Sequence, residues 1–300
     1  MSIAQFPRFS RLSISSKGLV ESITSRFEPY SDFNFASLFS WDDGTTELSI
    51  LNDNLVIKLV DYISGQPVYS ILGSNKIDES LELLLPLAKE LKLVPEVTIE
   101  NLRNNGHFEI REDRDNFDYI YNLDLLAHLP GGGLKKKRNK VSGFQKAFDT
   151  QALFVSTKLL RAEDAPSIDR IFVEWTKLPY KSIEEVQPEH KALSRLVQYS
   201  DAFKLYLTEV LIDSSLVAFS INEQVSPRYA VCHFEKALPA HQDKNIYTYL
   251  SNQVAKELAS LGCSLVNWEQ DLGLPGLRKS KLSYNPSGFL KKYSIKQQTG

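Results

Sequence analysis

The chain has 300 residues, of which 42% are hydrophobic and 24% are charged, and its formal net charge is −2. This composition is that of a globular protein with a sizeable core, and the length suits two domains of ordinary size. A net charge so close to zero excludes a chain that is basic throughout, so we expect no DNA partner. No apolar run approaches the roughly 20 residues that a membrane-spanning helix needs, and the opening residues lack a hydrophobic signal core. We therefore expect a cytoplasmic protein.

Several classes of site lack their usual residues. The two cysteines, Cys232 and Cys263, lie in apolar segments, which predicts buried, reduced thiols and no disulfide. The five histidines show none of the spacings of a zinc site, so we expect no metal. Motifs for a nucleophilic serine, for a phosphate-binding loop and for a dinucleotide are all absent.

The first half of the chain contains a readable series of elements. Residues 46–60 alternate as two strands around a turn at 52–54, and a third strand follows at 67–72. Apolar residues at helical spacing then predict a helix over 78–93, in which Pro86 is expected to kink the helix or delay its start. Residues 96–102, with the sequence EVTIENL, are predicted as the next strand.

The second half repeats this order. Two strands are predicted over 203–223 around a turn at 213–215, then a strand at 228–235, a helix at 244–262 and a strand at 264–270. The words AKEL at 88–91 and 255–258, and TIEN at 98–101 and NWEQ at 267–270, fall at matching places. Such a repeat predicts two domains, 1–150 and 151–300, each with three meandering strands, a helix and a parallel strand.

Two segments place basic side chains on the face that the apolar pattern assigns to the interior. In the helix predicted over 134–148, Lys137 and Arg138 fall among the apolar positions. In the short helix expected within 274–282, the inner side is marked by Leu274, Leu277 and Leu282. That same side carries Arg278 and Lys281.

Two explanations fit these inward cations, because a buried charge needs a partner. The first is internal ion pairing, for example of Glu269 with Arg278 or Lys281, or side chains whose charged ends reach water. The second is a site for an anionic small molecule, such as a phosphate or carboxylate. The pattern favours the first, whereas the absence of any acid after Asp271 favours the second.

His233 and Glu235 share one face of their predicted strand. A His-x-Glu pair of this kind can serve as an acid and a base. A hydrogen-bonded structural histidine is the more common outcome of such a pattern.

The segments LPGGGLKKKRNKVSGF, CHFEKA and NWEQDLGLPGLRKSKLSYNP resemble a bacterial family grouped with the C-terminal domain of phosphatidylglycerol lysyltransferase. The resemblance spans nearly the whole chain. It departs from the family pattern at Ser280, where alanine is expected, and in the loop LPAHQDKN, which lacks an expected glycine. It implies an α/β fold of two fused GNAT-like acyltransferase domains, each a mixed, mostly antiparallel sheet flanked by helices. Related Fem-type enzymes transfer an aminoacyl group from charged tRNA, and simpler relatives use acetyl-CoA.

The resemblance implies an acyltransferase that moves an aminoacyl or acyl group to an amine or hydroxyl. No tightly bound cofactor is expected, and acyl-CoA or aminoacyl-tRNA would be the co-substrate. The acceptor could be a peptide or a lipid headgroup reached at the membrane surface. The loop 237–245 would offer backbone N–H groups to a donor phosphate. The alternative is a catalytically inactive module that binds an anionic ligand or tRNA.

The candidate site combines the inward faces with the motifs. Glu269 is the first candidate for the base, with His233 and Glu235 as second choices. The groups expected to bind donor or acceptor are Lys137, Arg138, Asn139, Asn267, Trp268, Asp271, Arg278, Lys281, Tyr284 and Asn285.

Overall fold

The computed structural model describes residues 3–60, 65–103, 105–178 and 182–298. The chain forms two compact units: unit 1 comprises 1–119, 270–280 and 289–300, and unit 2 comprises 120–269 and 281–288. The predicted domains, 1–150 and 151–300, were defined by the sequence repeat, and that division stays a prediction. No helix in the described ranges is both long enough and apolar enough to cross a membrane.

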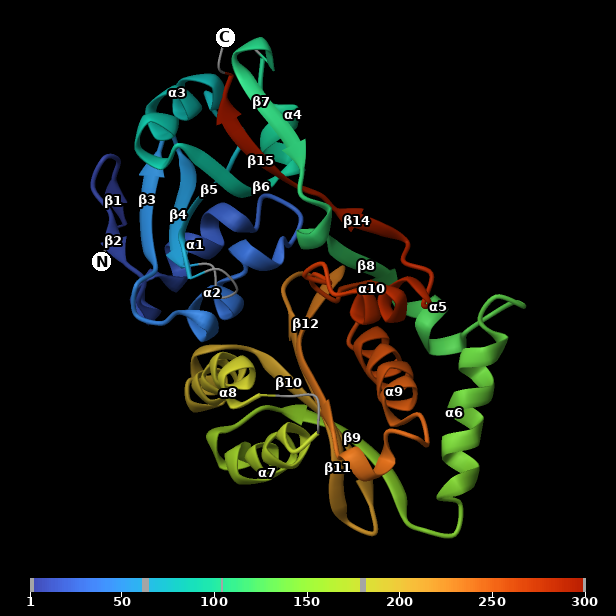
Figure 1. Cartoon of the computed structure of the whole chain (residues 1–300). Coiled ribbons are helices and arrows are strands. Elements are labelled where there is room, and N and C mark those ends of the chain that lie inside the picture. The colour runs from blue at the N-terminus through green and yellow to red at the C-terminus, as the bar shows by residue number, and fades with distance from the viewer. Residues whose placement is uncertain (1–2, 61–64, 104, 179–181, 299–300) are drawn as a thin grey trace. The chain divides into compact units, whose positions relative to one another are not determined.

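Unit 1 is built on a mixed sheet in the strand order β1-β3-β4-β5-β6-β15-β7, with β2 paired to β3 (Figure 1). The pairs β1/β3 and β5/β6 are parallel, and the other pairs are antiparallel. Its strands are β1 (Ala4–Gln5), β2 (Ser10–Arg11), β3 (Glu47–Leu51), β4 (Asn54–Val60), β5 (Pro67–Leu72), β6 (Glu90–Pro95), β7 (Phe108–Glu112) and β15 (Lys292–Gln297). Its helices are α1 (Lys17–Thr24), α2 (Phe35–Trp41), α3 (Ile77–Ala88) and α4 (Glu96–Glu100). Helix α3 supplies Ile77, Leu81 and Leu84 to a core completed by strand residues such as Val56 and Ile71.

The predicted strand at 96–102 is wrong. The strand is β6, one segment earlier, and residues 96–100 form the short helix α4. Helix α3 ends at Ala88 because Lys89 adopts a positive φ of 60°, which a right-handed helix does not allow. Leu91 and Val94 then join the core as strand residues. The proposed match of TIEN to NWEQ is therefore wrong as well.

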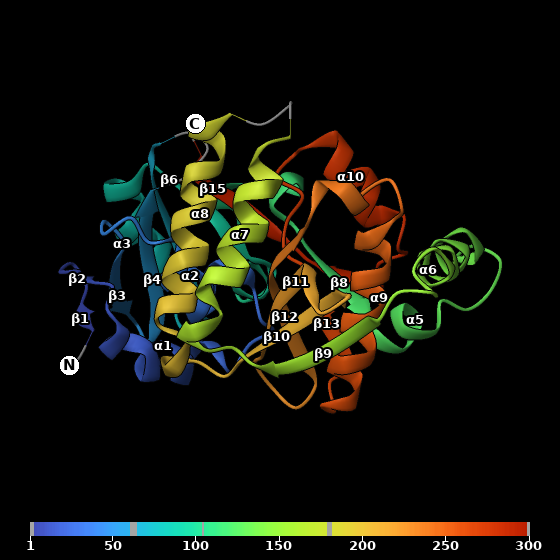
Figure 2. The ribbon, with the colours of Figure 1, turned by 90° about the horizontal axis from the view of Figure 1, so that it is seen from below.

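Unit 2 is built on a sheet in the order β14-β8-β13-β12-β11-β10-β9. Its strands are β8 (Asp118–Asn122), β9 (Leu153–Leu159), β10 (Leu205–Ile212), β11 (Ser215–Gln224), β12 (Tyr229–Ala237), β13 (Leu265–Asn267) and β14 (Gly288–Leu290). Its helices are α5 (Leu123–His128), α6 (Lys135–Ala147), α7 (Ala165–Thr176), α8 (Ile183–Gln198) and α9 (Ile246–Ser260). Helix α7 with α8 covers one face of β10–β12 and α9 the other, as both ribbon views show (Figures 1 and 2). A last helix, α10 (Pro275–Leu282), contributes residues to both units.

Both units have the strand and helix order that the repeat predicted. In unit 1 the meander β3-β4-β5 is followed by α3 and by β6, which is parallel to β5. In unit 2 the meander β10-β11-β12 is followed by α9 and by β13, which is parallel to β12. The first hairpin turns also correspond, because Asn52 and Asp53, like Asp213 and Ser214, all have positive φ. The predicted fold class, two GNAT-like α/β units with mixed, mostly antiparallel sheets flanked by helices, is confirmed.

Candidate functional site

In unit 2 the parallel pairing of β12 with β13 stops before β12 ends. Their pairing stops at Val231 and Asn267, and β13 ends there, whereas β12 continues to Ala237. The predicted strand at 264–270 is thus shorter than expected. The buried side chain of Asn267 accepts the N–H of Glu269 at 2.7 Å, and Glu269 has a positive φ of 53°. This turn leads the chain away from β12 and leaves its C-terminal half without a partner strand on that edge.

Glu235 lies on this half of β12, which pairs with β11 but extends beyond β13. Its Oε1 is buried and has no hydrogen-bond partner among the described residues. Burial raises the pKa of Glu235 from 4.5 to about 7, although the charges of Lys281 and Lys236 and the polar groups of Trp268 and Ser251 lower it. A carboxyl group with a pKa near neutrality can accept a proton at neutral pH and release it again.

His233 lies two residues earlier and is held by two carboxylates. Its Nε2 is 3.3 Å from Glu223 Oε2, and its Nδ1 is 3.6 Å from Glu269 Oε1. Burial alone would lower the pKa of His233, but the hydrogen bonds and charges of Glu223 and Glu269 outweigh burial and raise it from 6.5 to about 9. At neutral pH His233 is therefore an imidazolium, which has no free lone pair and is unsuited to be the base.

Three aromatic side chains, Trp268, Tyr121 and Tyr284, form an aromatic wall near Glu235. Trp268 packs edge-on against Tyr121, with ring centroids 5.2 Å apart, and its Nε1 is buried without a hydrogen-bond partner among the described residues. Lys281 donates to the backbone carbonyl groups of Trp268 and Glu269, which anchors the turn after β13. The Tyr284 hydroxyl lies 3.4 Å from Thr248 Oγ1. Burial raises the pKa of Tyr284, so this phenol stays protonated.

Lys137 lies against the same wall from helix α6. Its Nζ sits 3.3 Å from the centroid of the Tyr284 ring, which is a cation–π contact, and no carboxylate in the described ranges pairs with it. Burial, with a smaller contribution from Lys140, lowers the pKa of Lys137 to about 8. A half-buried cation with no carboxylate partner among the described residues suits the binding of a substrate anion.

The neighbouring predicted residues have different surroundings. Arg138 donates to the carbonyl groups of Leu129 and Gly131, the latter at 2.7 Å, and so holds the turn before α6. Asn139 is exposed on the outer face of α6. Asn285 has a positive φ of 54°, and its Nδ2 lies 3.6 Å from where a Cβ on Gly133 would be.

Asp271 and Arg278 lie in unit 1, apart from this set in the division of the chain. Arg278 binds Asp271 through both carboxylate oxygens, at 2.8 and 2.7 Å, and also contacts Asp115 at 2.6 Å. Tyr119, Arg114 and the N–H of Gly273 also donate to Asp271. Although burial opposes ionisation, these hydrogen bonds lower the pKa of Asp271 to about 2.

The predicted ion pair of Glu269 with Arg278 or Lys281 is wrong, because both cations have other partners. Arg278 pairs with Asp271 and Asp115, and Lys281 binds carbonyl oxygens. The expected inner side of the last helix is also wrong, because Leu274, Leu277 and Leu282 are 54%, 37% and 43% exposed. Helix α10 is anchored by its polar side chains and not by its leucines.

The candidate site includes groups that the sequence did not single out. They are Glu223, which pairs with His233, and Thr248 and Ser251 of α9, which lie near Tyr284 and Glu235. Thr248 and Ser251 are both 6% exposed and occupy one side of α9 three residues apart. Small hydroxyl residues at inward positions of a helix were the signal available in the sequence.

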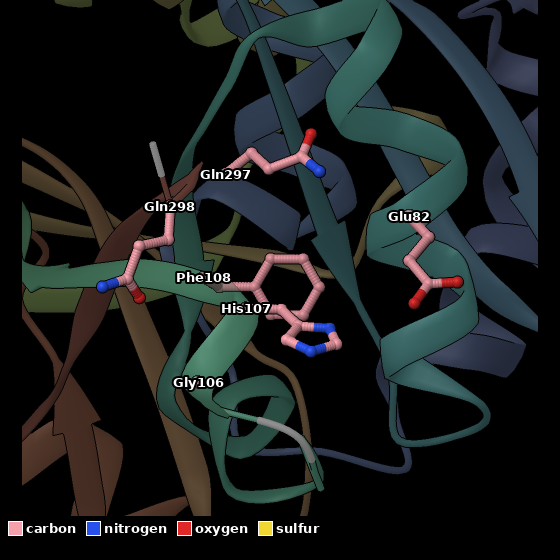
Figure 3. A pocket seen from close by; sticks show the side chains of 6 residues that line it. All are labelled: Glu82, Gly106, His107, Phe108, Gln297 and Gln298. Atoms are coloured by element: carbon pink, nitrogen blue, oxygen red, sulfur yellow. The ribbon is translucent and has the colours of Figure 1, made fainter. Parts of the chain in front are cut away.

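A hollow in unit 1 lies apart from all of these residues. It has a volume of about 560 Å³ and is lined by Glu82, Gly106, His107, Phe108, Gln297 and Gln298 (Figure 3). In the close-up, the Glu82 side chain of α3 stands across from the His107 ring. Within the described ranges, no group of three or more His, Cys, Asp or Glu side chains could hold a metal ion.

Comparison with known proteins identifies the family. The family described as "Phosphatidylglycerol lysyltransferase, C-terminal" matches residues 24–296. The chain belongs to this family. Membership points to an acyltransferase of the phosphatidylglycerol lysyltransferase type.

Solved structures resemble the phosphatidylglycerol lysyltransferase C-terminal fold of this chain along its length. A conserved protein of unknown function from Bacteroides thetaiotaomicron is 23% identical, with a TM-score of 0.82 over 97% of this chain and 99% of the other. L-PGS from Bacillus licheniformis is 15% identical, with a TM-score of 0.60 over 100% and 95%. FemX is 9% identical, with a TM-score of 0.55 over 96% of each chain. At these identities the likeness establishes the fold alone.

Proposed function

We propose that the chain is an acyltransferase whose reacting centre lies in unit 2 at Glu235. One observation carries the proposal: a buried carboxyl group with an unpartnered oxygen among the described residues, and a pKa raised to about 7, lies on the half of β12 that extends beyond β13. A fold gains nothing from burying an unsatisfied carboxyl group, whereas a general base needs this arrangement. Glu269, the first candidate from the sequence, pairs with His233 instead and serves as a positioning residue.

The reaction assigned to this centre is transfer of an acyl group to an amine or hydroxyl. Glu235 takes the proton of the attacking group as the new bond to the acyl carbon forms. The buried Nε1–H of Trp268, which lowers the pKa of Glu235 before the reaction, donates at that stage to the oxygen that becomes negative. The bond to the donor then breaks, and Glu235 returns the proton to the departing oxygen or sulfur. Lys137 binds an anionic group of the donor or acceptor.

The donor we favour is aminoacyl-tRNA rather than acyl-CoA. The loop 237–245 was expected to offer N–H groups to a donor phosphate. The N–H groups of His241, Gln242, Lys244 and Asn245 instead all donate to carbonyl oxygens three residues back in the same loop. With four of its N–H groups already bonded, this loop is less suited to hold a coenzyme pyrophosphate. For the acceptor we favour a lipid headgroup over a peptide, on family membership alone.

An assay of acyl transfer tests the proposal. The full chain is incubated with lysyl-tRNA or acetyl-CoA and with vesicles containing phosphatidylglycerol, and loss of the donor acyl bond is followed. Transfer from lysyl-tRNA is expected, and Glu235→Gln should lower its rate by about 10²- to 10⁴-fold. Glu257→Gln on α9 is the matched control and should keep the wild-type rate.

Other outcomes would redirect the proposal. Transfer from acetyl-CoA alone would replace the donor. A wild-type rate for Glu235→Gln would remove Glu235 from the mechanism. Binding of tRNA without turnover by the wild type would favour the alternative of an inactive binding module.

A further inference from the structure

Unit 2 contains a buried cation that the proposed reaction does not use. Lys236 of β12 is 6% exposed, and its Nζ lies 2.6 Å from Glu189 Oε1 on helix α8. The same Nζ lies 4.2 Å from the centroid of the Trp175 ring and 5.9 Å from that of the Phe172 ring, both on α7. An ion pair and two aromatic rings therefore surround this ammonium group.

Stability alone does not explain the pair of Lys236 and Glu189. Removing two charges from water costs several kcal/mol per ion, and their mutual attraction offsets this only when the geometry is excellent. Apolar side chains of similar volume often stabilise such a position equally well. The surroundings of Lys236 already include the apolar faces of Phe172 and Trp175, which such a side chain could contact. A charged pair at this position therefore indicates a role beyond packing.

The pair lies directly behind the proposed base. Lys236 follows Glu235 in β12, so their Cα atoms are about 3.8 Å apart and their side chains lie on opposite faces of the sheet. Both side chains are buried, and little water screens one charge from the other. The positive charge of Lys236 favours ionised Glu235 and lowers its pKa, as observed. The negative charge of Glu189 opposes this effect.

The other groups around Glu235 are fixed differently. Those that act on Glu235, or whose own pKa responds to its charge, are Cys232 of β12, Ser251 of α9, Trp268, Lys281 and Tyr284. The second cation of this set, Lys281, donates to backbone carbonyl groups, which are neutral. Lys236, in contrast, is paired with a carboxylate. The charge that Lys236 presents to Glu235 is therefore partly cancelled by Glu189.

Helix α8 holds Glu189 in place. The next residue, His190, stacks on the Phe172 ring with centroids 4.7 Å apart and planes inclined by 10°, and its Nε2 lies 2.6 Å from Asp169 Oδ1 on α7. Helix α7 in turn packs against β12. These contacts tie α8 to α7, so the distance between Glu189 and Lys236 is set by the packing of unit 2.

We propose that the buried pair of Glu189 and Lys236 sets the pH range in which Glu235 acts as the base. The inference rests on the proposed function and adds two positioning residues to it, since both act on the reaction only through Glu235. Lys236 favours the ionised form of Glu235, and Glu189 limits that effect. Loss of one charge should therefore shift the titration of Glu235 in the direction opposite to loss of the other.

The pH profile of acyl transfer tests this opposition. For the full chain, kcat/KM for transfer from lysyl-tRNA to vesicles containing phosphatidylglycerol is measured from pH 5 to pH 9. Glu189→Gln should move the midpoint down by at least about 0.5 pH unit, which raises kcat/KM at pH 5 about threefold. Lys236→Met should move the midpoint up by a similar amount. The double variant should return it close to that of the wild type.

An exposed pair on α7 provides the matched control. Lys177 and Glu174 are also 2.6 Å apart, but both side chains face solvent. Glu174→Gln and Lys177→Met make the same changes of charge and should leave the midpoint unchanged. Midpoints that stay at the wild-type value in both Glu189→Gln and Lys236→Met, or that move in the same direction, would overturn the proposal. Because Glu189→Gln keeps the shape of its side chain, its downward shift tests the proposal even if Lys236→Met fails to fold.

Thermal melting separates this proposal from the proposed function. Glu189→Gln and Lys236→Met are each melted with and without Glu235→Gln, from pH 4 to pH 9 and without substrate. The pKa of Glu235 is raised above 4.5, so its carboxyl group loses stability as pH rises, and the loss levels off near that pKa. The levelling should come at lower pH in Glu189→Gln and at higher pH in Lys236→Met.

The two proposals fail in different ways. If melting shows the opposed shifts but no variant or wild type transfers an acyl group, the role of the pair stands and the catalytic assignment fails. If transfer depends on Glu235 but neither substitution moves the midpoint or the levelling, the role of the pair fails and the catalytic assignment stands.

Discussion

The two units share one order of strands and helix, yet they differ at the end of their parallel strand pair. In unit 1, Thr98 closes that place: its hydroxyl accepts the N–H of Gly73 at 3.2 Å and donates to the carbonyl of Ile71 at 3.3 Å. In unit 2 the corresponding end of β12 carries Glu235, whose Oε1 has no partner in the described ranges. At the same place in the architecture, one unit has a side-chain hydroxyl bonded to two backbone groups, and the other has a carboxyl group with one unpartnered oxygen among the described residues.

Buried charge follows the same division. In unit 1, Lys292 is 0% exposed, but its ammonium group lies 2.8 Å from Asp118 and also contacts Asp32 and Ser31. In unit 2 the charges around Glu235 act from a distance and leave one oxygen unsatisfied. Fully paired buried charge therefore indicates structure, and incompletely paired charge indicates chemistry.

The largest effect on stability is expected in the buried ion-pair cluster of Lys292, Asp118 and Asp32 in unit 1. Lys292→Met leaves the carboxylates of Asp118 and Asp32 buried without their cation and should lower the free energy of unfolding by about 3–5 kcal/mol. Urea denaturation of the full chain measures this loss. Lys296→Met is the control, because Lys296 is exposed and pairs with Glu90, so that its loss should cost less than about 1 kcal/mol. Equal losses in the two variants would erase the difference between buried and exposed pairs.

Substitution of Glu235 in unit 2 should have the opposite effect on stability. Because the pKa of Glu235 is raised from 4.5 to about 7, the wild type loses stability as pH rises through this window. Glu235→Gln carries no such charge and should be more stable than the wild type at pH 8, by up to about 3 kcal/mol, since one pKa unit is worth about 1.4 kcal/mol. The difference should vanish below pH 4.5. Thermal melting at both pH values measures it, and a variant less stable at pH 8 would mean that Glu235 is structural.

The rate should follow the same titration. A base must be ionised, so kcat/KM for transfer should rise about a hundredfold from pH 5 to a plateau above the pKa of about 7. His233 should not contribute to this rise, because its pKa is raised to about 9. A flat profile, or one that falls across this range, would assign the base elsewhere.

The smallest expected effect concerns the closure in unit 1. Thr98→Val keeps the shape of the side chain but leaves the N–H of Gly73 without its acceptor, which should cost about 1–2 kcal/mol. Thr98→Ser keeps the hydroxyl and should cost less, and urea denaturation compares the two. If Val is tolerated as well as Ser, hydrogen bonding does not close this strand pair.

The local elements were largely predictable, because they depend on neighbours in sequence. Both meanders and both hairpin turns follow from alternation and turn residues. The errors occurred where backbone conformation decided the outcome. Positive φ at Lys89 ended a helix early, and positive φ at Glu269 ended a strand early. Because β13 ends at Asn267, the alternation of a strand does not apply to residues 268–271.

The site was predictable as a set of residue types but not as a set of contacts. His233 and Glu235 share a strand face because they are two residues apart, which alternation specifies. The partners of Asp271 and Lys292, in contrast, include Tyr119 and Asp118, more than 150 residues away in the chain. Helical phase cannot choose among such distant partners, which explains the mistaken pairing of Glu269 with Arg278.

The place of β15 in unit 1 has a consequence for biosynthesis. This strand lies between β6 and β7 and is formed by residues 292–297, far along the chain from both of its partners. Until they emerge, β6 and β7 each present an unpaired edge, and the sheet of unit 1 is incomplete. Assembly of that sheet therefore has to wait until residue 297 has been synthesised, and until then the edges of β6 and β7 must be shielded from edge-to-edge association.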